Sequence, residues 1–174
     1  GNYIDDVTVL RLCMVYGPGA KGNILKIIKA IKKGIPLLLP EFHNKRSMVD
    51  VRDVADAALL VAETPLAKRQ TYIISDGNVY STRQIIDAIY QTLGKFRWPI
   101  AVPSWIFTAL AKIGNIIGKA RGKRFIFDSD ALSKISGSAW FSSNKIEHEL
   151  KFKAKFSLAK SLPQMIENIK YIGY

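Results

Sequence analysis

A glycine-rich turn near the start of the chain has residue types and a spacing that can bind phosphate. The hexapeptide Gly17-Pro18-Gly19-Ala20-Lys21-Gly22 matches G-x-G-x-x-G between an apolar run and an amphipathic pattern, and Glu41 stands about 20 residues further on. At a helix start, unpaired N–H groups would face a dinucleotide's pyrophosphate. However, Pro18 removes one N–H donor, and Glu41 follows Pro40 in an expected loop. The fingerprint is therefore a secondary hypothesis.

The remaining candidates for catalysis or metal binding stand alone in the sequence. His43 and His148 have no acid or nucleophile placed to make either a general base, so we interpret both as surface residues. Cys13 lies in an apolar run and is interpreted as a buried small hydrophobe. One cysteine and two histidines offer neither a disulfide framework nor a metal-ligand spacing. We therefore predict no catalytic, cofactor-binding or metal-binding residue in this chain.

The composition is that of one globular domain or of two small lobes. The chain has 174 residues, of which 48% are hydrophobic, enough to bury a core. A single cysteine suits a reducing cytoplasm. The longest apolar run, residues 105–118, is interrupted by Lys112 and Asn115 and is shorter than the roughly 20 residues that span a bilayer. We expect no transmembrane segment.

The net charge of +12 attracts anions in general, which leaves several classes of partner open. Nucleic acid is one alternative, because Phe96, Trp98 and Trp105 lie near basic residues and could stack on bases, but no known nucleic-acid motif accompanies them. An anionic membrane surface is another: residues 105–124 are apolar and then basic, which would suit a lipid-linked substrate and a position peripheral to the inner membrane. The diphosphate of an activated sugar is the third.

Strand and helix patterns alternate along the chain, which predicts an α/β fold. Strands are expected at residues 7–15, 35–39, 46–51 and 71–75, with a short one at Trp140-Phe141. Helices are expected at 22–33, after a cap at Asp53, after a capping box formed by Ser81 and Gln84, and at 103–119, 128–135, 144–150 and 157–169. This order of elements places the glycine turn and Asn23 between the first predicted strand and the helix that follows it.

Three motifs occur in a fixed order along these elements. They are Arg11 followed by Val15-Tyr16-Gly17-Pro18-Gly19, then Gly22-Asn23-Ile24, then the stretch from Arg46 to Ala55. The strand and turn at residues 72–77 and the segment 140–150 follow. Together they resemble the C-terminal portion of the extended short-chain dehydrogenase/reductase family, which includes the nucleotide-sugar 4-epimerases and 4,6-dehydratases. Within that family they are most similar to the UDP-sugar 4-epimerases. The resemblance runs from about Val9 to the end.

The resemblance implies the domain organisation and the function. Residues 1–174 would form one C-terminal fragment: the last part of a Rossmann-type parallel sheet, with strands at about 7–15 and 71–75, and a small mixed α/β substrate-binding lobe at about 22–51 and 95–174. The parent would be an NAD(P)-dependent, homodimeric epimerase or dehydratase that acts on a nucleoside-diphosphate sugar, such as a UDP-sugar, for cell-surface polysaccharide synthesis. The N-terminal NAD-binding part would be a missing partner. Because the family's Tyr-x-x-x-Lys is absent, this chain is expected to be inactive alone; because the family's N-terminal Gly-x-x-Gly-x-x-Gly is also absent, it is expected to bind no cofactor.

The resemblance also assigns substrate-binding residues. Arg46 matches the arginine that contacts phosphate, a role for which a planar guanidinium is suited. Asn23 and Ile24 open the helix that would receive the second phosphate or the sugar. Leu39 matches a position that packs on the nucleotide base, and either Lys134 or Arg124 would supply a second phosphate contact. Met14 departs from the family, in which several members carry a substrate-contacting Asn there.

Overall fold

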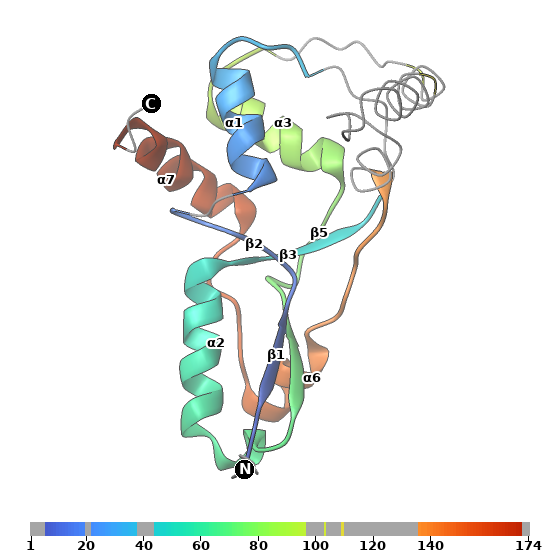
Figure 1. Cartoon of the computed structure of the whole chain (residues 1–174), viewed down its shortest axis with the longest axis vertical. Coiled ribbons are helices and arrows are strands. Elements are labelled where there is room, and N and C mark those ends of the chain that lie inside the picture. The colour runs from blue at the N-terminus through green and yellow to red at the C-terminus, as the bar shows by residue number, and fades with distance from the viewer. Residues whose placement is uncertain are drawn as a thin grey trace, which may run out of the picture.

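A computed structural model of the chain describes residues 6–19, 22–37, 44–96, 103, 109 and 136–171. Its strands form two small sheets (Figure 1). In one, β1 (Val9–Leu12) pairs in parallel with β4 (Thr71–Ile74). In the other, β2 (Met14–Tyr16) pairs in parallel with β3 (Arg46–Asp50), and β3 pairs antiparallel with β5 (Val79–Tyr80). The predicted α/β class with parallel strands is confirmed.

The single strand expected at residues 7–15 is wrong, because the chain divides it between the two sheets. The break falls at Cys13, whose N–H donates to the Ile74 carbonyl at 3.2 Å, at the end of β4. Beyond it, Met14 pairs with Met48 of β3. Both halves are apolar and extended, so periodicity alone cannot reveal a change of partner.

Most of the predicted helices are confirmed to within one or two residues. The structure contains α1 (Asn23–Lys32), α2 (Val51–Glu63), a 3₁₀ turn (Pro65–Ala67), α3 (Thr82–Thr92), α6 (Asn144–Leu150) and α7 (Leu158–Tyr171). At α3, Ser81 and Gln84 form the expected capping box: the Ser81 Oγ accepts from the Gln84 N–H at 3.1 Å, and the Gln84 Oε1 accepts from the Ser81 N–H at 2.7 Å.

Three local predictions are wrong, and two predicted helices stay untested. Asp50, not Asp53, caps α2, because β3 runs directly into the helix and the Asp50 carboxylate accepts from the Arg52 N–H at 2.9 Å. Residues 35–37 form no strand, and near Trp140-Phe141 the extended pairing is reduced to one bridge between Ala139 and Arg46. Most of the helices expected at 103–119 and 128–135 lies outside the described residues.

Two hydrophobic clusters support the two sheets. Figure 1 shows α1, α3 and α7 gathered beyond β2 and β3, and α2 and α6 flanking β1 and β4. The first cluster joins α1, α3 and α7 to β2 and β3, and it includes Tyr16, Ile28, Met48, Ile86, Ile89, Leu158, Leu162 and Met165. The second joins α2 and α6 to β3 and β4, and it includes Val49, Ala57, Tyr72, Ile74, Ile146 and Leu150. Because β3 contributes Met48 to one cluster and Val49 to the other, its alternation links both cores.

Within the part of the chain that the structure describes, no helix is long and apolar enough to cross a membrane. The same residues contain no group of three or more His, Cys, Asp or Glu side chains that could hold a metal ion.

Candidate functional site

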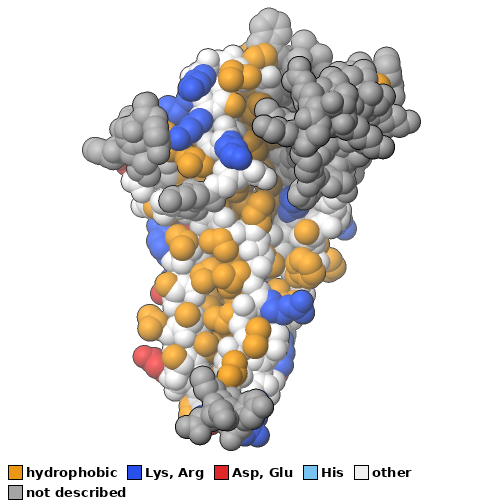
Figure 2. Space-filling view, viewed as in Figure 1, with side chains coloured by type: hydrophobic (Ala, Val, Ile, Leu, Met, Phe, Trp, Pro, Cys, Tyr) orange, Lys and Arg blue, Asp and Glu red, His pale blue; other side chains and the backbone are white. Residues whose placement is uncertain are grey.

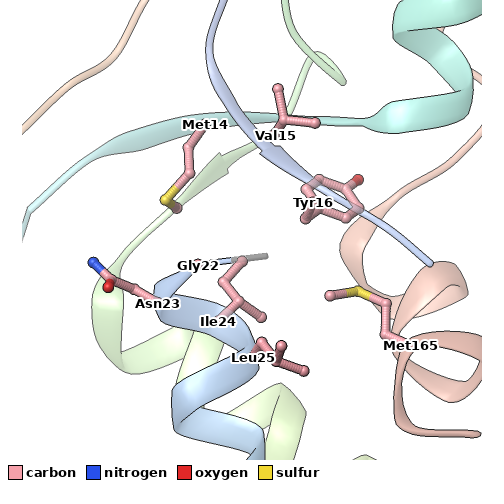
Figure 3. A pocket seen from close by; sticks show the side chains of 8 residues that line it. All are labelled: Met14, Val15, Tyr16, Gly22, Asn23, Ile24, Leu25 and Met165. Carbon is pink, nitrogen blue, oxygen red and sulfur yellow. The ribbon is translucent and has the colours of Figure 1, made fainter. Parts of the chain in front are cut away.

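A pocket of about 250 Å³ lies at the start of α1, between that helix, β2 and α7. Its lining residues are Met14, Val15, Tyr16, Gly22, Asn23, Ile24, Leu25 and Met165. Figure 3 shows Met14 and Asn23 on one side and Tyr16 and Met165 on the other. Asn23 contributes the amide side chain, and the other side chains of the lining are apolar apart from the Tyr16 hydroxyl. The pocket therefore combines an apolar wall with one polar group at a helix start.

The Tyr16 hydroxyl is directed away from the pocket and into a buried network (Figure 3). It donates to the Asp76 carboxylate at 2.8 Å and lies 3.3 Å from the Phe156 carbonyl oxygen. The Tyr80 hydroxyl donates to the same Asp76 oxygen at 2.8 Å. Burial raises the pKa of Asp76, and burial together with the Asp76 charge raises the pKa of Tyr16. Tyr16 therefore presents its ring, and not its hydroxyl, to a ligand.

The first turn of α1 has amide groups without a side-chain cap. Gly22 occupies the N-cap position, and no side chain accepts a hydrogen bond from the first turn. No acidic residue lies in that turn, whereas Lys29 and Lys32 lie in the last one. The N-terminal N–H groups and the helix dipole favour an anion at this position. Asn23, the first residue of α1, is exposed there.

Arg46 begins β3 on the same face of the sheet as the pocket. Arg46 and Met48 are two residues apart on one strand, so their side chains leave the same face. Met48 pairs with Met14 and packs with Ile24 in the core under α1. The Arg46 side chain is half-buried, and burial lowers its pKa, but a guanidinium remains charged in proteins. The β2–β3 sheet therefore places a fixed positive charge on the face that carries Met14.

Two neighbouring segments hold the start of β3 in place. Arg46 pairs with Tyr80 of β5 on one side and forms a bridge with Ala139 on the other. The buried Asn44 side chain donates to the Thr82 hydroxyl at 2.9 Å and to the Gly137 carbonyl at 3.2 Å, and it accepts from the Thr82 N–H at 2.9 Å. These hydrogen bonds of Asn44 were not predicted, because no local sequence pattern marks Asn44. They join segments that are 38 and 93 residues away in sequence.

Gly17 of the glycine-rich turn is packed tightly against the start of α2. Gly17 has φ +131°, and a Cβ there would lie 2.8 Å from Val51 Cγ1 and 3.2 Å from an Asp50 carboxylate oxygen. Packing against the start of α2 therefore explains why residue 17 is a glycine. A Cβ at Gly19 or Gly22 would meet nothing within 4 Å, and Ala20 and Lys21 lie outside the described residues, so the dinucleotide fingerprint stays a secondary hypothesis.

Two buried carboxylates at the start of α2 connect the sheet to α7. Asp50 makes paired hydrogen bonds with the Arg52 guanidinium, 2.8 Å from Nε and 2.8 Å from Nη2, and accepts from the Ser161 hydroxyl at 2.5 Å. Asp53 accepts from the backbone N–H groups of Lys155 and Phe156 at 2.8 and 3.1 Å. The chain that enters α7, and hence Met165 in the pocket wall, is thus tied to α2.

The hydrogen bonds of Asp50 are expected to contribute to the free energy of unfolding in a way that is lost at acid pH. Burial alone raises the pKa of Asp50, but the hydrogen bonds from Arg52 and Ser161 outweigh it and hold the pKa below its ordinary value of 3.8. The contribution is therefore complete above pH 3.8 and is lost as the pH falls further. We expect Asp50→Asn to lower the free energy of unfolding by about 1–3 kcal/mol at pH 7.

Urea unfolding of both proteins across a pH series measures this difference. It should be constant from pH 7 down to pH 3.8 and shrink below that value. A difference that is unchanged at about pH 2.5 would show that Asp50 does not titrate as an acid with a lowered pKa.

The structure brings part of the predicted site together. Asn23 and Ile24 line the pocket, and Arg46 lies on the same sheet face. Leu39, Lys134 and His43 lie outside the described residues. His148 is exposed on α6 and Cys13 is half-buried, where burial raises the pKa of its thiol. Met165 and Leu25 were not predicted as lining residues; α7 carries Met165 in a regular apolar pattern that indicated only a core.

Comparison with known proteins finds similarity to epimerases and related enzymes. The model of the NAD dependent epimerase/dehydratase family matches residues 2–75. UDP-glucose 4-epimerase of Vibrio cholerae is 28% identical over 160 residues, covering 91% of this chain and 45% of that protein. Human short-chain dehydrogenase/reductase family 42E member 1 is 26% identical, covering 84% and 42%. The N-acetyl-α-D-glucosaminyl-diphospho-undecaprenol 4-epimerase of Escherichia coli O157:H7 is 20% identical, covering 92% and 48%.

Solved structures show the fold. UDP-glucuronic acid 4-epimerase of Bacillus cereus, in complex with UDP-glucuronic acid and NAD, superimposes with a TM-score of 0.67 at 17% identity. The match covers 95% of this chain and 46% of that one. The chain has the fold of the NAD-dependent epimerases and dehydratases. It spans about half the length of the curated relatives it matches, 45% of the Vibrio cholerae protein. Asn23 and Arg46 lie within residues 2–75, which the family model matches.

Proposed function

We propose that this chain is the substrate-binding C-terminal part of a cytoplasmic, NAD-dependent nucleotide-sugar epimerase or dehydratase. Its role is to orient a nucleoside-diphosphate sugar, such as a UDP-sugar used for cell-surface polysaccharides. It supplies no proton-transfer residue, since the Tyr-x-x-x-Lys motif is absent from it, and is inactive alone. Orientation is a substantial part of such catalysis, because the chemistry itself belongs largely to the cofactor.

The placement of Arg46 carries this proposal. The Arg46 backbone is held by β5 and Ala139, and its half-buried side chain leaves the same sheet face as the pocket at the uncapped start of α1. A diphosphate has two anionic groups that need charge-assisted donors, and these two features supply them. Calorimetric titration tests the proposal with UDP and with uridine, which lacks the phosphates. UDP should bind and uridine should bind far more weakly; a folded chain that binds neither would contradict it.

The NAD-binding part of the protein is the proposed partner of an exposed apolar face. Among the described residues, β1 has a pairing partner on one edge only. Val9 and Leu12 of β1 and Val51 and Leu59 of α2 are exposed, Leu59 to 62%. Figure 2 shows apolar side chains gathered over the region where Figure 1 places β1 and α2. Parallel strands normally have both faces covered, and this face would be covered by the half that the matched relatives have in addition.

The same proposal predicts that the chain alone binds neither NAD nor NADP appreciably. The family's N-terminal glycine-rich cofactor turn is absent from this sequence, and Gly17 of the Gly17-to-Gly22 turn is packed against Val51 and Asp50. Calorimetry with each dinucleotide measures this, and micromolar binding to the chain would revive the Gly17-to-Gly22 fingerprint.

Mixing the chain with the NAD-binding part should form a complex in size-exclusion chromatography. Leu59→Lys, a charge on the exposed face, should weaken that complex.

A lipid-linked sugar diphosphate is the second candidate substrate. The similarity over 92% of the chain to an enzyme named for an undecaprenyl-linked sugar favours it, as does the net charge of +12, which would attract an anionic membrane surface. Sedimentation with anionic and neutral vesicles distinguishes it: binding that requires anionic lipid supports peripheral membrane contact. Salt-sensitive binding to an oligonucleotide would instead support the nucleic-acid alternative.

A further inference from the structure

The pocket beside Asn23 has a lining that suits an apolar substituent better than sugar hydroxyls. Met14, Ile24, Leu25 and Met165 contribute apolar side chains, and the Tyr16 hydroxyl is engaged by Asp76 on the far side of its ring. A hydroxyl buried here would lose its water and find few partners, which is costly. An aliphatic group would lose no hydrogen bond.

Met14 and Asn23 lie next to each other in this lining (Figure 3). An acetamido group has the same two components, a methyl group and an amide. The Asn23 carboxamide can accept from its N–H and donate to its carbonyl oxygen. The Met14 thioether is flexible and can pack closely on the methyl group. The pair is therefore complementary to an acylamino substituent.

The position of the pocket agrees with this chemistry. In a glycosyl diphosphate, the substituent on C2 is the sugar group adjacent to the carbon that carries the phosphate. If the phosphates lie at Arg46 and the start of α1, the C2 substituent falls beside Asn23. We propose that the pocket holds the 2-acetamido group of an N-acetylhexosamine diphosphate, an inference that rests on the proposed sugar-diphosphate function.

Titration of the whole chain with three ligands tests this inference: UDP, UDP-glucose and UDP-N-acetylglucosamine. Burial of one methyl group and its amide predicts about fivefold tighter binding of the acetamido sugar than of UDP-glucose. Met14→Asn should reduce this preference to about twofold or less, because it makes the wall polar. Leu66→Asn places the same amide at a site that is 64% exposed and should keep the fivefold preference.

The outcomes separate the inference from the function on which it rests. Equal affinity for the two sugars, with UDP bound, would overturn the inference and leave the function; failure of all three ligands to bind would overturn both. Should Met14→Asn not fold, saturation-transfer NMR of the wild-type chain decides, because the acetyl methyl should receive the strongest saturation. Strong saturation of the ring protons alone would contradict it. Repeating the titration with the sugar diphosphate on a short polyprenol identifies the carrier, and tighter binding of that form supports the second candidate substrate.

Discussion

Arg46→Ala is expected to weaken UDP binding by about tenfold or more. The substitution removes a charged hydrogen-bond donor to an anion, which costs on the order of 1.5–3 kcal/mol, and about 1.4 kcal/mol corresponds to a factor of ten. Arg46→Lys should recover only part of the affinity, because an ammonium group cannot make two parallel hydrogen bonds to one phosphate. Titration calorimetry at one fixed salt concentration measures all three proteins.

Arg83→Ala is the matched control for this series. Arg83 lies on α3 and pairs with Asp87 at 3.7 Å across the helix surface. Its loss removes the same net charge without touching the sheet face that carries Arg46. UDP affinity should change little in this variant. Equal binding of UDP by the wild type and Arg46→Ala, with both folded by circular dichroism, would remove the residue-level basis for a nucleotide site.

Asp53→Ala is expected to lower the free energy of unfolding by about 3 kcal/mol or more. The Asp53 carboxylate is fully buried and accepts from the backbone N–H groups of Lys155 and Phe156. Alanine leaves both donors without this acceptor, and a buried polar group that loses its partner costs about 1–3 kcal/mol. Asp53→Asn retains one carbonyl acceptor and should lose less. Urea unfolding measures the three values.

Asp56→Ala provides a closely matched control on the same helix. Asp56 contacts the same residue, Lys155, but through an exposed ion pair of 2.6 Å with its Nζ. Exposed pairs of this kind contribute about 0–1 kcal/mol. A loss at Asp56 as large as the loss at Asp53 would mean that the charge pair, and not the buried backbone contact, holds residues 155 and 156.

The consequences of the Asp53 contact extend to the pocket. Phe156 lies just before α7, and its ring packs 3.6 Å under the Arg52 guanidinium, which is itself bound to Asp50. Ser161 and Met165 follow on α7, one bonded to Asp50 and the other in the pocket wall. A variant that releases this segment should therefore change both stability and ligand binding.

Local sequence signals predicted the helices well. The Ser81 and Gln84 pair marked the start of α3 because a capping box involves residues only three apart. The apolar repeats of α1 and α7 were also sufficient, since each helix has a buried face with the expected period. In these cases the information lies within one or two turns of the chain.

Where partners are distant in sequence, the predictions failed. The apolar run at residues 7–15 does not reveal that β1 pairs with β4 and β2 with β3. Asp53 has the residue type of a helix cap, but the structure uses Asp50 as the cap and gives Asp53 to Lys155 and Phe156, 102 and 103 residues away. Both carboxylates could cap a helix. The position at which β3 ends and α2 begins decides that Asp50 is the cap.

The sequence alone determined the α/β class, the helices of the described residues and the residue types that can bind a phosphate, because these depend on local periodicity and chemistry. The motifs also indicated Arg46 and Asn23 by resemblance. Only the tertiary structure decided that Arg46 shares a sheet face with Met14 and that the Tyr16 hydroxyl is turned to Asp76. Only packing decided that Gly17 is closed off by Val51. Strand register and side-chain direction arise from contacts between segments that are far apart in the chain, and no local pattern encodes them.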